Sequence, residues 1–147
     1  MYHLDRNKFH EIEHTADTGM QVTGLTVEEL FANAAFSMLS VIYTRLPEQA
    51  QMEKSFELDD SNLSDLLVRW LSEINYLLTV HHFLPSIIPD LNIHQGKNGY
   101  ILKATLNGMN SKKYEEYFRT EVKAVTYHQL ALSQNEYGYH CRIIFDI

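Results

Sequence analysis

The stretch HTADTG, residues 14–19, puts an aspartate and a glycine between two segments that alternate like β-strands. Asp and Gly are poor strand residues, so sheet propensity does not explain them there. As a turn residue, Asp17 would accept hydrogen bonds from nearby backbone N–H groups. As a ligand, its carboxylate would suit a hard divalent cation, which prefers carboxylate and carbonyl oxygens. Such a site needs more oxygen ligands from elsewhere in the chain.

The other end of the chain offers these ligands. The sequence finishes CRIIFDI, a buried-strand run that ends in Asp146 and Ile147, and Ile147 adds its α-carboxylate. If the first and last strands pair, Asp17, Asp146 and the Ile147 carboxylate converge, and a Ca²⁺ or Mg²⁺ ion would relieve their mutual repulsion. The alternative is that Asp146 is the solvated end of a strand.

Other chemically capable side chains favour simpler roles. His10 and His14 lie four residues apart in a strand-like segment, about 13 Å by strand rise, so they cannot share one ion unless the strand bends. Lys123, in EVKAVTYHQL, suits a solvated face, a salt bridge to the acidic cluster or a partner contact. Cys141 lies in an apolar strand, where a thiol is generally inert. With no nucleophile or nucleotide motif, the residues favour a metal-binding accessory protein over a self-sufficient enzyme.

Composition excludes several classes of protein. The 147 residues are 45% hydrophobic and 21% charged, as in an ordinary globular domain, and the net charge is −7. That charge opposes direct, phosphate-driven nucleic-acid binding and suits a cation or a basic protein partner. One cysteine excludes an internal disulfide and fits a reducing compartment. No apolar run approaches a membrane span, and the opening residues are too polar for a secretory signal, so we expect a cytoplasmic protein without membrane contact.

Periodicity indicates the elements that must position these residues. Residues 9–24 alternate as one strand or as two short strands bent at the motif, and residues 52–58 alternate as another. A helix is expected to begin just after Leu25, where Thr26 and Glu29 form a capping box, and to end at Leu46-Pro47. A second amphipathic helix follows a cap at Asn62 or Ser64 and closes before Pro85. Strand-like segments then follow around 86–94, 99–107, 113–127, 129–134 and 138–146.

This order predicts an α+β fold: two amphipathic helices packed on one face of an antiparallel or mixed sheet. The order is β-α-β-α followed by several strands, in a single compact domain over residues 1–147.

Three segments together resemble the archease family. EHTADTGMQVTGLTVEELFANAAFSML is similar to the family's opening H-T-A-D-x-G motif with its strand and helix. DLLVRWLSEINYLL resembles the family's second helix, and EVKAVTYHQL with the closing IIFDI resembles its C-terminal strands. The segment VHHFLPSIIPDLNIHQGKNGY departs from the pattern, but it carries none of the expected metal ligands.

The resemblance implies an acidic α+β protein that activates the tRNA-splicing RNA ligase, an enzyme that joins RNA ends with GTP and a divalent metal through a guanylated histidine. Archease-like proteins promote this guanylylation and multiple turnover, and do not ligate RNA themselves. The family's metal site falls here on Asp17, Asp146 and Ile147, for a cation of the Ca, Mg or Mn type. Lys123 matches the lysine of the K-A-V-T-Y-H segment, and His14 and His128 match further motif positions without an assigned role.

Two other hypotheses stay open at this point. In the first, the protein is a chaperone-like binding module and the ion only pins the terminal strands together. In the second, it is an independent hydrolase with an acidic metal pair, although it lacks an evident base, nucleophile or substrate loop. The sequence does not fix the physiological metal, the oligomeric state or the surface that meets a partner.

Overall fold

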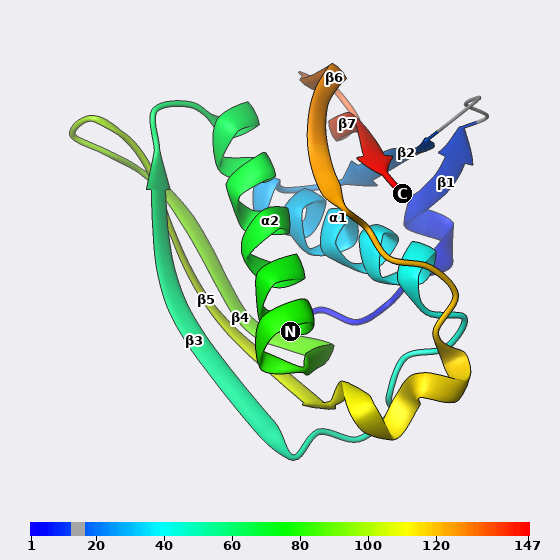
Figure 1. The fold of residues 1–147 in the computed structure, drawn as a ribbon. Coiled ribbons are helices and arrows are strands. Elements are labelled where there is room, and N and C mark those ends of the chain that lie inside the picture. The colour runs from blue at the N-terminus through cyan, green and yellow to red at the C-terminus, as the bar shows by residue number, and fades with distance from the viewer. Residues whose placement is uncertain (13–16) are drawn as a thin grey trace.

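The computed structural model describes residues 1–12 and 17–147. Its strands form two antiparallel sheets, a four-stranded sheet of order β1-β2-β7-β6 and a three-stranded sheet of order β3-β5-β4. The two long helices lie between them, and each helix contacts strands of both sheets (Figure 1). In chain order the elements are η1 (Arg6–Lys8), β1 (Phe9–Ile12), β2 (Thr18–Gly24), α1 (Val27–Ile42), β3 (Met52–Asp60), α2 (Leu63–His81), β4 (Phe83–Gly96), β5 (Gly99–Asn110), η2 (Ser111–Tyr117), β6 (Ala124–Asn135) and β7 (Gly138–Asp146).

The predicted α+β class and the order of its elements are confirmed, with one difference in the layers. The strands divide into two sheets instead of one, so the helices are covered on two sides. Among the described residues, no helix is long and apolar enough to cross a membrane.

Helix α1 begins as its capping box predicts. The Thr26 side chain accepts a hydrogen bond from the Glu29 N–H at 3.1 Å, which satisfies one of the free N–H groups of the first turn. Every residue from Leu30 to Ile42 is buried, so α1 is enclosed all round between the two sheets. Its buried Asn33 is tolerated because its Nδ2 donates to the Thr23 carbonyl at 2.8 Å.

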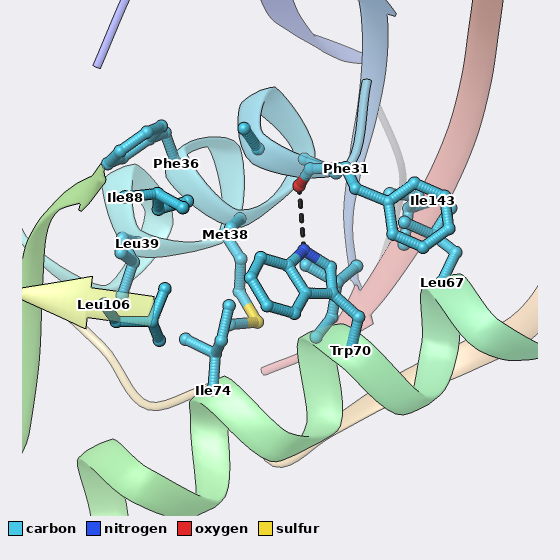
Figure 2. Packing of buried hydrophobic residues seen from close by; sticks show 14 of the residues in the cluster. Phe31, Phe36, Met38, Leu39, Leu67, Trp70, Ile74, Ile88, Leu106 and Ile143 are labelled. Atoms are coloured by element: carbon cyan, nitrogen blue, oxygen red, sulfur yellow. Dashed lines mark hydrogen bonds between the residues drawn. The ribbon is translucent and has the colours of Figure 1, made fainter. Parts of the chain in front are cut away.

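Helix α2 is amphipathic, as predicted, and is capped by Asn62, whose side chain accepts from the Asp65 N–H at 2.8 Å. Its fully buried Trp70 donates from Nε1 to the Phe31 carbonyl of α1 at 2.8 Å. Figure 2 shows this bond among apolar side chains from both helices and both sheets, including Leu106 of β5 and Ile143 of β7. The packing of α1 against α2 is thus fixed by one directed bond inside a continuous core.

The strand predicted over 113–127 is wrong for its first half. Residues 111–117 form the 3-10 helix η2, and a connecting segment leads to the start of β6 at Ala124. Tyr114 has non-helical backbone angles (φ −123°, ψ 19°), so η2 is kinked there, and the ring centroids of Tyr114 and Tyr117 are 6.0 Å apart. The strands expected at 113–127 and 129–134 are in fact joined in β6, which is interrupted by a bulge between Thr126 and Ala131.

Candidate functional site

The aspartate of the opening motif precedes a strand that pairs with the last strand. In the antiparallel pair of β2 and β7, Thr18 faces Phe145, and both are buried on the helix side of the sheet. Asp17 directly precedes Thr18 and Asp146 directly follows Phe145, so in this antiparallel pair both aspartates lie just beyond the Thr18–Phe145 rung, on the same side of it. Asp146 is exposed and Asp17 is half-buried. The condition set by the sequence, pairing of the motif strand with the final strand, is therefore met.

Strand β6 pairs with β7 on the side opposite to β2 and reaches Asp146. Ala124 faces Asp146, and the Lys123 N–H donates to the Asp146 carbonyl at 2.7 Å. The backbone at Asp146 is thus held by β6, while its side chain stays in solvent. The side chain of Lys123 is also exposed.

Ile147 turns away from this solvent face. Its side chain packs against the core and lines a cavity of about 370 Å³, whose wall includes Thr18 and the side chains of Arg6 and Arg119. Ile147 thus covers the side of the sheet that faces the helices. The cavity that it lines lies at the same end of the sheet as Asp17 and Asp146.

The remaining predicted residues lie apart or outside the description. His128 is exposed in the bulge of β6, four residues beyond Ala124, which is at most about 13 Å of extended strand. His14 belongs to residues 13–16 and lies outside the described residues. The structure therefore gathers Asp17, Asp146 and Ile147 at one end and sets His128 further along the sheet.

The donor chemistry of this end suits a hard cation. Within residues 1–12 and 17–147, no three His, Cys, Asp or Glu side chains are grouped to hold a metal. The predicted set contains only two such side chains, because its third member is the α-carboxylate of Ile147. All three are oxygen donors, as Ca²⁺ and Mg²⁺ require, and such ions commonly complete their coordination with water.

Comparison with known proteins decides the family. The model of the "Archease protein family (MTH1598/TM1083)" matches residues 9–147. The chain belongs to the archease family. An archease from Methanosarcina mazei is 36% identical over 140 residues, covering 95% of this chain and 96% of that protein. An archease from Saccharolobus islandicus is 34% identical over 139 residues, covering 95% of this chain and 98% of that protein.

Two solved structures share the archease fold. Methanobacterium thermoautotrophicum protein 1598 in solution has a TM-score of 0.80 and 28% identity, covering 95% of this chain and 99% of that chain. A Thermotoga maritima crystal structure, described as "an archease, possible chaperone", has a TM-score of 0.61 and covers both chains fully; its 23% identity supports the fold alone. The family resemblance of the three sequence segments is confirmed.

Within this archease-family chain, Cys141 is not a candidate nucleophile. Its side chain is 4% exposed in the core, and burial raises the pKa of the thiol to about 12. The thiol is thus kept in its unreactive protonated form, as its apolar strand predicted.

Sequence reasoning missed the two arginines near the acidic end. Arg6 lies in η1 and Arg119 follows η2, so they are far apart in the chain and meet only because both segments reach the cavity beside Ile147. No motif marks either residue. Only the tertiary fold places them in the cavity that Ile147 lines.

Proposed function

We propose that this protein activates an RNA-splicing ligase by promoting the GTP-dependent guanylylation of the ligase and its multiple turnover. Membership of the archease family supports the class of function. The observation that supports the role of the site is the β2–β7 register, which puts Asp17 and Asp146 next to each other in the ladder order, just beyond the Thr18–Phe145 pair at the end of the sheet. The protein acts as an accessory to the ligase and not as the catalyst.

In this proposal, Asp17, Asp146 and the Ile147 α-carboxylate hold a divalent cation. When bound, the ion supplies positive charge that orients phosphate or carboxylate oxygens of the ligase active site. The chain itself supplies position. The Lys123 N–H fixes the Asp146 backbone at 2.7 Å, and the exposed Asp146 side chain remains accessible to a partner.

The charge of the chain supports a protein partner over RNA. With a net charge of −7, the protein would repel a phosphate backbone and attract a basic protein surface. We therefore propose contact with the ligase, without strong direct RNA binding and without a membrane, in the cytoplasm.

The test is guanylylation of the ligase with radiolabelled GTP, with and without this protein. Wild type is compared with Asp17→Asn, which keeps the size of the side chain and removes its charge. The matched control is Glu136→Gln, because Glu136 is exposed at the opposite end of the β6–β7 pair. We expect Asp17→Asn to lose most of the stimulation and Glu136→Gln to retain it. Equal stimulation by wild type and Asp17→Asn would sink the proposed role of Asp17.

A metal-stabilised, chaperone-like binding module is the second candidate. It is favoured by the same register, since an ion between Asp17 and Asp146 would tie two terminal strands together. The description of the Thermotoga maritima archease as a "possible chaperone" fits this reading. It predicts that EDTA lowers the melting temperature and that ligase stimulation follows the folded fraction. Loss of stimulation by a variant that stays fully folded would exclude it.

A further inference from the structure

A cavity of about 310 Å³ opens where the two long helices end. Its apolar walls come from the last residue of α1, Ile42, and from Leu78 in the last turn of α2. The remaining lining residues come from the helix ends and from the segment that leads to β6: Tyr43, Asn75, Thr79, His82, Phe118, Glu121 and Val122. This cavity is separate from the acidic end and from the cavity beside Ile147, which has other lining residues.

The electrostatic environment of this cavity is negative. A helix C-terminus carries about half a negative charge, which Lys or Arg in the last turn usually offsets. Neither helix has a Lys or Arg there: α1 has no basic residue in its last turn, and α2 has only His81. None of the described residues that line the cavity is a Lys or Arg, and Arg119, the nearest along the chain, lines the cavity beside Ile147. Among the residues of the wall that the structure describes, His82 alone is of a basic type.

Two side chains add acceptors. Glu121 is exposed at the cavity and forms no ion pair with any described residue. Asn75 donates from Nδ2 to the Val122 carbonyl at 2.8 Å, which fixes its amide in the wall. Its Oδ1 is buried and accepts no hydrogen bond within the described part of the chain. An unpaired buried acceptor is costly, so a donor that reached it would be stabilised.

An exposed aromatic ring completes the cavity. Phe118 is 51% exposed, although its position is fixed by a β-bridge to Tyr43 and by an edge-to-face contact with the Tyr43 ring at 5.7 Å. The next N–H, that of Arg119, donates to the Ile42 carbonyl at 2.7 Å. Phe118 is thus held rigidly at the mouth of a negative, apolar cavity, an arrangement that suits a cation with a planar face.

We propose that this cavity binds an arginine side chain presented by a basic surface of a partner protein. The apolar walls accommodate the methylene stem, Phe118 stacks on the guanidinium, and Glu121 accepts its N–H groups. Arginine fits better than lysine because its planar head stacks on rings and its five N–H groups can serve several acceptors at once. The net charge of −7 adds a general attraction for a basic partner. The inference does not depend on the function proposed above.

The test is an NMR titration of the ¹⁵N-labelled full chain with N-acetyl-L-argininamide at pH 8. N-acetyl-L-citrullinamide, which has the same shape without the charge, is the matched ligand control. We expect saturable shifts of the backbone amides of Phe118, Glu121 and His82 with the arginine derivative, and none with the citrulline derivative. Glu121→Gln and Phe118→Ala should each weaken binding roughly two- to fivefold, the size of one exposed ion pair or cation–π contact.

Glu116→Gln is the matched protein control, because Glu116 is exposed in the same region but lines another depression. It should bind like the wild type. Equal shifts with citrulline, equal binding by N-acetyl-L-lysinamide, or unchanged affinity in Glu121→Gln would each overturn the assignment of the cavity to arginine.

Discussion

Replacing Asp146 by Asn should change stability in opposite directions with and without a divalent ion. Asp17 and Asp146 come next after the Thr18–Phe145 pair, on the same side of it, so with the spacing of residues directly opposite in a sheet their carboxylates would be about 6 Å apart. Asp146 is exposed, so the appropriate dielectric is close to that of water, and the repulsion is about 0.7 kcal/mol. Without metal, Asp146→Asn removes this repulsion and should raise the melting temperature by about 2 °C for a chain of this size.

With metal the order should reverse. A cation at a hundredfold excess over its Kd stabilises the folded wild type by about 2.7 kcal/mol, or roughly 8 °C, and Asp146→Asn loses one charged ligand. The assay is thermal unfolding followed by circular dichroism, in EDTA and in millimolar Ca²⁺ or Mg²⁺, with Glu136→Gln as the charge-matched control. If Asp146→Asn melts no higher than wild type in EDTA, or if both gain equally from the ion, the reasoning from the register is refuted.

Three further predictions concern the framework that holds the site. Trp70→Phe should lower stability by about 1–3 kcal/mol in urea denaturation, because it removes the bond to the Phe31 carbonyl and leaves a small cavity; the exposed Tyr76→Phe should be neutral. Gly108→Ala should lower it by more than about 2 kcal/mol, because its Cβ would meet the Leu84 carbonyl group, with the carbonyl carbon at 2.8 Å. Gly19→Ala, whose nearest neighbour would be Ile12 at 3.6 Å, should cost less than about 1 kcal/mol. Burial raises the pKa of the Cys141 thiol to about 12. The folded protein therefore keeps its full stability with respect to this thiol below about pH 8.5, where the thiol is protonated in both states, and loses stability as pH rises towards 12, because only the unfolded chain then releases the proton. In native protein at pH 8, iodoacetamide should therefore leave Cys141 unmodified, and rapid labelling would contradict this.

Local signals predicted the local structure well. The capping box at Thr26 and the two cap candidates Asn62 and Ser64, of which Asn62 is the cap, located the starts of both helices, because caps act through bonds within one turn. The alternation of apolar and polar residues indicated where strands lie but not which strands pair, so it could not predict that they divide into two sheets. The enclosure of α1 depends on that division. The break expected between residues 127 and 129 falls inside the bulge of β6, but no residue type predicted that one strand would continue across it, since Gln129, which has φ 53°, is not a typical turn residue.

The sequence could predict the candidate site only on the condition that the first and last strands pair. Asp17 and the final Asp146 could be identified by residue type, but their proximity required the pairing of β2 with β7, which joins opposite ends of the chain. The cavity at the ends of α1 and α2, which we propose binds arginine, was not indicated by any sequence pattern. Asn75, Phe118 and Glu121 come from two segments, and their meeting depends on where α1 and α2 end in space.

One short segment connects the end of the sheet that carries Asp17 and Asp146 with the cavity at the ends of α1 and α2. Glu121 and Val122 line the cavity, and the next residue, Lys123, donates its N–H to the Asp146 carbonyl. Two backbone hydrogen bonds hold this segment: the Arg119 N–H donates to the end of α1 and the Lys123 N–H donates to β7. The spacing between the two sites is therefore fixed. A partner that reaches the acidic pair with a cation would therefore find a second, preformed acceptor for positive charge within a few residues. Two weak polar contacts held at a fixed spacing by a rigid segment discriminate partners better than either contact alone, because both must match at once.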